Sequence, residues 1–343
     1  MAIIRVGVDI AKSVFHVHGV DRQGKCCWSG KYSRAKWVDQ IRKKVPQEAE
    51  IAMEACASAH YWSRVLMRHG YMVKLIAPQF VKPYVKSNKN DAADAAAIAE
   101  AMSRPHMRYV AVKSVDQQDI QALHRVREEL VKQRTAKANQ IRGLVGEYGI
   151  VAPIGIHTLR KAIPCWLEDA TNGLTDRFRL LLAGLQEDLI FIDQRVVSIT
   201  TEIEQHAVSD PVANKLLALR GIGPLSASAL AGIIGDGKQF RRGRDFAASL
   251  GLTPRQHSTG GKDRLLGISK RGDSYLRKLL VHGARSVVRH AQNKEDNLSH
   301  WINELKKRKH VNIATVALAN KTARIAWAII TGDGHYDDKR VAA

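Results

Sequence analysis

Two long amphipathic stretches in the middle of the 343-residue chain constrain its fold most. Apolar residues recur every three or four positions over 115–148 and again over 174–207, with charged residues on the other faces. This is the period of an α-helix with one apolar face. A segment containing Pro153 and Pro164 separates the stretches, so they can fold back on each other as an antiparallel coiled coil. We predict a coiled-coil assembly arm over 111–210, and the core of a helical bundle is the alternative.

The residues before the arm alternate between short apolar runs and helical patterns. Strands are predicted at 3–9, 14–20, 25–33, 50–55 and 72–77, and helices at 34–44, 59–69 and from Asp91 onward. Three strands precede the first helix, and the later strands alternate with helices. An antiparallel meander followed by strand–helix units is the order of the ribonuclease-H-like fold. We therefore predict an α/β domain of this fold over 1–110.

The residues after the arm have mostly helical patterns, and we predict a mostly α C-terminal domain over 211–343. The apolar runs near 225–234 and 325–330 are shorter than a membrane span, and the N-terminus lacks the layout of a signal peptide. The four cysteines form no CxxC pair, which favours incidental reduced thiols over a metal or disulfide role. We expect a soluble cytoplasmic protein.

Basic residues gather at the two ends of the chain. The 54 Lys+Arg exceed the 33 Asp+Glu and give a formal net charge of +21. Residues 1–110 carry +9, residues 111–210 carry −2 and residues 211–343 carry +14. The excess predicts a polyanionic partner, nucleic acid before an anionic membrane surface. The split predicts two modules that face nucleic acid, joined by a nearly neutral spacer.

Four carboxylates of the first domain stand at informative positions. Asp9 ends the first predicted strand and Glu54 ends the fourth, whereas Asp91 and Asp94 share one face of a helix. Burying acids among apolar residues is costly unless a cation pairs with them. In a ribonuclease-H-like sheet these strand ends meet beside the last helix, and converging carboxylates suit Mg²⁺. We predict that the four acids bind Mg²⁺. An N-cap role for Asp91 and a helix-dipole role for Asp94 are the alternative.

The sequence Leu219–Gly223, LRGIG, fits the pattern of a helix-hairpin-helix motif. In such a motif, backbone N–H groups at the hairpin and at a helix N-terminus contact a DNA phosphate and read no bases. Gly221 and Gly223 allow a close approach of that phosphate. We predict both glycines as DNA contacts, and a plain glycine-containing turn between helices is the alternative.

A Gly-, Ser- and Lys-rich stretch over 253–273 predicts a flexible loop that faces phosphate. Ser258 in this loop can donate a hydrogen bond to phosphate or attack phosphorus, and composition alone favours the first role. Other residues predicted to contact nucleic acid are Lys12, Arg255, Thr259, Lys262, Lys270, Arg271 and Arg277.

Several motifs occur in an order found in one family. They are Gly7–Lys12, Met53–Ala55, Lys89–Ala95, Leu250–Gly261, Ile268–Asp273 and Val316–Arg324. The chain resembles the DEDD transposases of the one-hundred-ten family of bacterial insertion sequences, relatives of the Piv DNA invertase. The resemblance covers nearly the whole chain.

This resemblance implies a RuvC-like ribonuclease-H fold, a coiled-coil insertion and a C-terminal transposase domain. Asp9, Glu54, Asp91 and Asp94 would be the metal-binding tetrad of a DNA recombinase. A serine that becomes joined to a DNA phosphate falls on Ser258, and its neighbour Thr259 is a poorer nucleophile because its β-branch crowds the attack. The family also implies a structured noncoding guide RNA as partner, and we expect a homo-oligomer, dimer or tetramer, with a site composed either within one subunit or across subunits.

Three other functions fit parts of the sequence. A Holliday-junction endonuclease would use the same tetrad with water as nucleophile, but it gives no reason for the Ser258 stretch. An actin-like sugar kinase shares the opening Val8–Ile10, but residues 95–210 lack its glycine-rich nucleotide loops. A non-catalytic architectural DNA-binding protein would not need Asp9 or Asp94.

Overall fold

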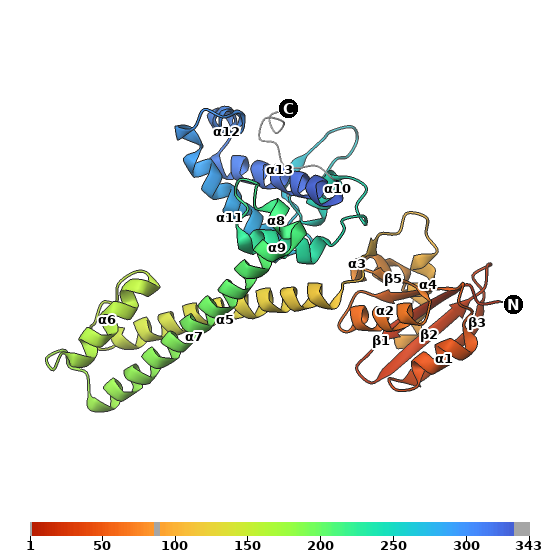
Figure 1. The fold of residues 1–343 in the computed structure, drawn as a ribbon, viewed down its shortest axis with the longest axis horizontal. Coiled ribbons are helices and arrows are strands. Elements are labelled where there is room, and N and C mark those ends of the chain that lie inside the picture. The colour runs from red at the N-terminus through yellow and green to blue at the C-terminus, as the bar shows by residue number, and fades with distance from the viewer. Residues whose placement is uncertain (1, 86–89, 333–343) are drawn as a thin grey trace. The chain divides into compact units, whose positions relative to one another are not determined.

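The computed structural model describes residues 2–85 and 90–332, so Lys89 of the predicted motif lies outside the described residues. The chain divides into two compact units, Met1–Ser114 and Val115–Ala343 (Figure 1). The first unit is a mixed α/β sheet unit and the second is mostly helical, as the sequence predicts. Both long helices of the arm belong to the second unit.

The first unit is built on a six-stranded sheet. Its strands are β1 (Arg5–Ile10), β2 (Val14–Val20), β3 (Cys26–Ser33), β4 (Glu50–Glu54), β5 (Met72–Ile76) and β6 (Tyr109–Val110), in the order β3-β2-β1-β4-β5-β6. β2 runs antiparallel to β1 and β3, whereas β1, β4 and β5 are parallel to one another. The five predicted strands are present. β6 has two residues, too few to show a period in the sequence.

Helices cover both faces of this sheet. Successive strand residues point to opposite sides, and apolar strand residues on each side pack against helices. One face packs against α1 (Trp37–Lys44) and α2 (Ala59–Arg68), where Phe15 stacks on Trp37 with ring centroids 4.8 Å apart. The other face packs against α4 (Asp91–Met102), preceded by the short α3 (Pro78–Val81) and a 3₁₀ turn at Lys82–Tyr84.

Gly7 lets α4 lie directly on β1. A Cβ added at Gly7 would stand 2.2 Å from the Ala95 carbonyl oxygen and 2.6 Å from the Ala99 nitrogen, closer than any side chain tolerates. Both atoms belong to the backbone of α4 and cannot move without the helix. The close packing fixes the start of α4 beside the carboxyl end of β1.

The arm of the second unit consists of α5 (Val115–Gly146) and α7 (Asp176–Ser209), which pack along each other. Buried residues such as Ile141 and Leu182 line their contact, and at one end both helices contact α9 (Pro224–Ile234). The connector between them holds a further helix, α6 (Ile156–Glu168), which the sequence pattern did not predict because Pro164 lies inside it. α6 packs on α7 and α5.

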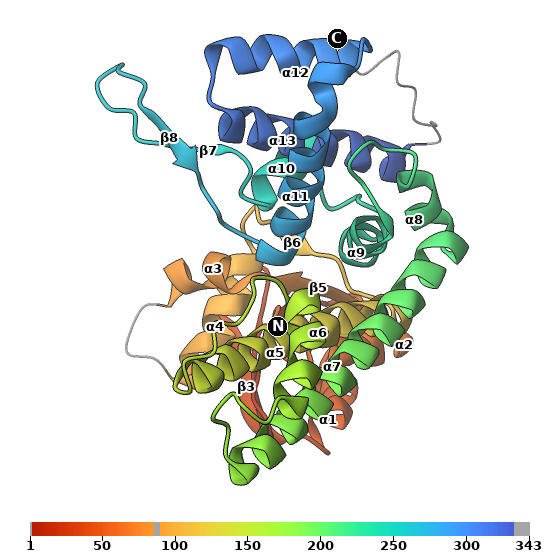
Figure 2. The same cartoon turned by 90° about the vertical axis from the view of Figure 1, so that its left-hand side faces the viewer.

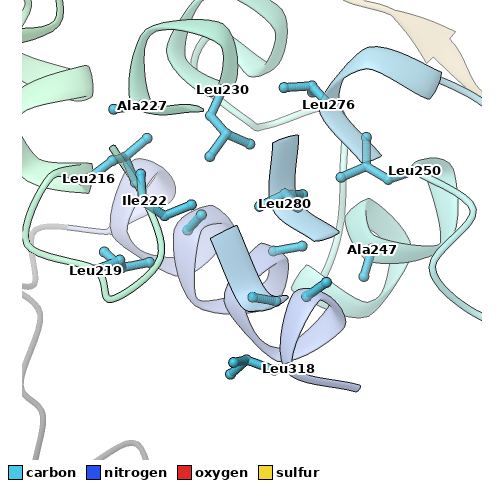
Figure 3. Close-up of a cluster of buried hydrophobic side chains, with 14 of the residues drawn as sticks. Leu216, Leu219, Ile222, Ala227, Leu230, Ala247, Leu250, Leu276, Leu280 and Leu318 are labelled. Carbon is cyan, nitrogen blue, oxygen red and sulfur yellow. The ribbon is translucent and has the colours of Figure 1, made fainter. Parts of the chain in front are cut away.

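The remaining helices of the second unit enclose its largest hydrophobic core. They are α8 (Pro211–Leu216), α10 (Gly243–Ser249), α11 (Ser274–His290), α12 (Asn297–Arg308) and α13 (Val311–Thr331), with a 3₁₀ turn at Ala291–Asn293. Figure 3 shows Leu216, Leu230 and Leu280 converging in this core. Among the described residues, α13 alone has the length and apolar composition of a membrane span. It contributes Leu318 and other buried residues to the core.

The predicted flexible loop at 253–273 is a β-hairpin instead. Its strands β7 (Pro254–Gln256) and β8 (Leu265–Ile268) pair in antiparallel fashion, and Thr259 bridges to Lys262 across a two-residue turn. Gly260 and Gly261 take φ values of +56° and +75°, the left-handed backbone that a tight hairpin turn requires. Figure 2 shows the hairpin extending away from the helices of its own unit.

Candidate active site

Sheet register brings Asp9 and Glu54 together. Val8 of β1 lies beside Met53 of β4, and the two acids follow these residues along parallel strands. Both acids stand one position after residues of the face that α1 and α2 cover, so they point to the face under α4. Each side chain is half-buried.

Asp91 and Asp94 occupy the first turn of α4. The N-cap is Asn90, whose Oδ1 accepts a hydrogen bond of 2.8 Å from the Ala93 N–H. The alternative that Asp91 caps the helix is therefore wrong. The close packing of α4 at Gly7 places Asp94, the residue before Ala95, next to the end of β1.

The pKa of Asp9 responds to its burial and to the other three acids. Burial, and then the negative charges of Asp94, Asp91 and Glu54, raise the pKa of Asp9 to about 6, against an opposing effect of His16. The protein thus gathers carboxylates that repel one another. A divalent cation relieves that repulsion, and oxygen donors of this kind fit hard ions such as Mg²⁺.

His16 is a member of this cluster that the sequence analysis did not select. It lies directly across from Asp9 in the β1–β2 pair, and its Nδ1 is 3.4 Å from Asp91 Oδ2. One ligand atom each from Asp9, His16 and Asp91 all lie within 4.8 Å of one another. A tight turn at 11–13 places residue 16 opposite residue 9 in the β1–β2 pair. His16 could therefore have been selected from the sequence only if the register of this hairpin had been known.

Ser258 lies on the exposed hairpin of the second unit, where its hydroxyl has two partners. Ser258 Oγ donates to Asp263 Oδ1 at 2.7 Å, and Gln256 Nε2 donates to Ser258 Oγ at 2.8 Å. Gln256 Nε2 also donates to Asp263 Oδ1 at 3.1 Å, so the three side chains form a closed ring of hydrogen bonds. Thr259 flanks the turn and is held there by two backbone hydrogen bonds with Lys262.

Most residues predicted to contact nucleic acid are exposed. Lys12 lies in the turn between β1 and β2, and the exposed residues of the hairpin and the segment after it are Arg255, Thr259, Lys262, Lys270 and Arg271. Arg277 is half-buried, and its Nη1 donates to the carbonyl oxygens of Leu250 and Arg271 at 2.9 and 3.0 Å. That guanidinium thus fastens the base of the hairpin.

The two glycines of the LRGIG sequence serve different local roles. Gly221 has φ +82°, and a Cβ there would stand 2.9 Å from the carbonyl oxygen of Gly283 in α11. Its small size is therefore used in packing between the turn and α11. Gly223 is exposed and is the N-cap of α9, with Pro224 as the first helical residue.

Two family models match this chain, one over the region of the acidic cluster and one over the region of the Ser258 hairpin. A DEDD IS110-type family model, described as "Transposase", matches residues 6–150, and the model of the "Transposase IS116/IS110/IS902 family" matches residues 213–299. The first match contains the acidic cluster and the second contains the Ser258 hairpin. The two regions together define a transposase.

Relatives extend the similarity over the whole chain. A "Probable family 20 transposase" of Pseudomonas aeruginosa is 51% identical over 98% of this chain and 99% of its own length. A "Transposase for insertion sequence element IS1111A" of Coxiella burnetii is 44% identical over 96% of this chain and 90% of its own. The "Pilin gene-inverting protein" of Moraxella lacunata is 21% identical over 74% of this chain and 73% of its own length. The chain belongs to the IS110/IS116/IS902 family of transposases.

Proposed function

We propose that this transposase cuts and rejoins the DNA strands of its own insertion sequence with a divalent-metal site and a serine nucleophile. The observation that carries the proposal is the gathering of Asp94, Asp91 and Glu54 around Asp9, where burial and then their charges raise its pKa to about 6. A cluster of this kind costs free energy to fold, and a bound cation would offset that cost.

Asp9, Glu54, Asp91 and Asp94 would hold Mg²⁺, with His16 at the edge of the same cluster. Bound Mg²⁺ would neutralise charge on the scissile phosphate and orient it for attack. The sheet, through the β1–β4 register, and α4, through its close packing at Gly7, keep the carboxylates in position. The strand order β3-β2-β1-β4-β5 supports the ribonuclease-H-like assignment of this unit.

Ser258 is the proposed nucleophile. Its hydroxyl is exposed on the hairpin and accepts and donates hydrogen bonds, whereas Thr259 is bound into the turn and carries a crowding β-branch. Attack by Ser258 Oγ on phosphorus makes a serine–DNA phosphodiester. Because one ester replaces another, the bond energy is kept for rejoining.

The proposed nucleic-acid partners are the DNA of the element ends and target and a structured noncoding guide RNA. Base pairing with the RNA would choose the sequence, while exposed basic residues such as Lys12, Lys262 and Arg271 contact phosphates. The turn from α8 to α9 would act as a helix-hairpin-helix, with Gly223 at the phosphate and Gly221 in packing. Residues 1–110, 111–210 and 211–343 are the proposed catalytic, assembly and transposase domains, acting in the cytoplasm.

The arm would assemble a dimer or tetramer in which the acidic cluster and the serine meet across subunits. Its surface carries exposed apolar side chains that a partner helix would cover, among them Leu180, Leu181, Phe191 and Val197. This arrangement also explains why the metal ligands and Ser258 belong to different units of one chain.

A denaturing gel tests the proposal. Purified protein is incubated with Mg²⁺, labelled duplex DNA of the element's ends and RNA transcribed from those ends, and the label is followed for attachment to protein. Wild type is expected to form a covalent adduct, and Ser258→Ala is expected to bind both nucleic acids but form none. An adduct that survives in Ser258→Ala overturns the nucleophile. Cutting with free ends and no adduct in either protein supports instead a Holliday-junction endonuclease that uses water.

A further inference from the structure

The hairpin separates its side chains by face. From Gln256 to Thr259 and from Lys262 to Leu265 the strands are in register, since the His257 N–H bonds to the Arg264 carbonyl and Thr259 pairs with Lys262. Alternation then places Gln256, Ser258 and Asp263 on one face and the side chains of the intervening residues on the other. Ser258 and Asp263 are direct cross-strand neighbours.

The other face is basic and polar. It carries His257, Thr259, Lys262 and Arg264, all exposed. Among the hairpin residues Pro254–Ile268, Asp263 is the single carboxylate. A negative charge beside a nucleophile that approaches a phosphate opposes binding by Coulomb repulsion. Its presence at the serine therefore calls for a role that outweighs this cost.

We infer that Asp263 is the general base that takes the proton of Ser258, and that Gln256 is a positioning residue that holds the pair together. This inference rests on Ser258 being the nucleophile. The supporting geometry is the 2.7 Å hydrogen bond from Ser258 Oγ to Asp263 Oδ1, which lies within the range needed for direct proton transfer. Gln256 Nε2 donates to both oxygens, at 2.8 and 3.1 Å, and fixes their separation.

The proton and the bonds balance in both directions. As the Ser258 Oγ–P bond forms, the hydroxyl proton passes to the Asp263 carboxylate and the bond from phosphorus to a deoxyribose oxygen breaks. That oxygen leaves with a proton from water. In rejoining, a DNA hydroxyl attacks phosphorus and gives up its proton to solvent, and protonated Asp263 returns its proton to the departing Ser258 Oγ. No water is consumed across the cycle.

Asp263→Asn is the sharpest test, because the amide keeps the size of the carboxylate and an oxygen that can accept from Ser258 but is not basic. Adduct formation is measured in single turnover with the full-length protein, Mg²⁺, element-end DNA and end-derived RNA. The rate is expected to fall by about 10²–10⁴-fold at neutral pH, with DNA and RNA binding retained. The loss is expected to shrink as pH rises and hydroxide replaces the carboxylate, so the variant gains a steeper pH profile than wild type.

Controls separate this inference from the proposal beneath it. Asp236→Asn makes the same chemical change at an exposed residue of the same unit and should react like wild type. Gln256→Ala should slow the adduct less than Asp263→Asn and leave the pH profile of the wild type, as expected for a positioning residue. If wild type forms an adduct that Ser258→Ala lacks, but Asp263→Asn matches wild type in rate and pH profile, Asp263 only braces the hairpin and the inference is overturned. If wild type forms no adduct, the serine mechanism itself has failed.

Discussion

Each of the two units holds an ionisable group whose pKa is shifted by burial, and the two shifts have opposite directions. In the sheet unit, burial and neighbouring carboxylates raise the pKa of Asp9 to about 6. In the helical unit, burial, Arg127 and His206 lower the pKa of His124 to about 4. Both nitrogens of the neutral His124 ring have hydrogen-bond partners, since Nδ1 lies 2.9 Å from the Tyr275 hydroxyl and Nε2 lies 3.2 Å from Ser228 Oγ.

Acidification therefore changes the stability contributed by these two groups in opposite directions. Because Asp9 binds its proton more tightly in the folded state, the folded state gains stability as pH falls through about 6 toward the ordinary pKa of 3.8. Because His124 binds its proton less tightly in the folded state, stability is lost as pH falls from 6.5 toward about 4. The sheet unit thus keeps a half-buried carboxylate at a cost in stability, whereas in the helical unit the neutral ring of His124 links α5 to α9 and α11 through its hydrogen bonds.

The largest expected effect comes from removing the centre of the acidic cluster. Asp9→Ala should lower DNA strand cleavage by at least about 10³-fold, since the proposed metal site would lose one of its carboxylates. The same change should raise the midpoint of thermal unfolding of metal-free protein, because the repulsion goes with it. The two readouts, cleavage on a sequencing gel and calorimetry without Mg²⁺, should move in opposite directions. A drop in both would show that Asp9 is a structural residue.

Gly7→Ala tests whether close packing of α4 holds the cluster. The added Cβ meets backbone atoms of α4, so the sheet unit should lose about 3 kcal/mol of stability or shift the helix away from β1. Gly143→Ala in α5 is the matched control, because a Cβ there meets nothing within 4 Å. That change should leave stability equal or raise it by up to about 1 kcal/mol. Urea unfolding of both variants gives the answer, and equal stabilities would contradict the packing argument.

The pH dependence of the helical unit should depend on His124. Between pH 7 and pH 5, its depressed pKa should cost the unit about 2 kcal/mol of stability. His124→Gln should flatten this dependence, at some loss of stability at pH 7, while His157→Gln at an exposed site should leave it in place. Urea unfolding of each protein across this pH range measures the effect. A wild-type profile in His124→Gln would mean that another group titrates.

The smallest effect is expected at the edge of the acidic cluster. His16→Ala should weaken binding of Mn²⁺, used as a probe for Mg²⁺, by about tenfold, as expected for a group that contacts and orients the ligands. Titration by electron paramagnetic resonance measures free Mn²⁺ directly. His18→Ala serves as the control, because His18 lies two residues further along β2 and on the same face of the sheet. Equal loss in both variants would mean that the substitution disturbs β2 and not the cluster.

How much the sequence predicts differs between the two units. β1 to β5 and the long helices follow from hydrophobic period, and the acids Asp9 and Glu54 follow from strand ends in a parallel pair. His16 could not be selected, because its role depends on register across a turn. The hairpin was missed since its strands have three and four residues and a bulge, too short for alternation. Asp263 was missed for the same reason, as its link to Ser258 exists only once the turn at Gly260–Gly261 is formed.

The contacts at the two ends of α5 and α7 bear on whether the arm can change in length. Both helices contact α9 at one end of the arm, and α6 bridges them at the other. Among the described buried residues of the core around α9 and α11, Ala207 of α7 is the single one that comes from α5 or α7. Equal insertions or deletions of seven residues in both helices would keep their facing stripes in phase. We therefore expect that the arm can be lengthened or shortened without disturbing the core around α9 and α11.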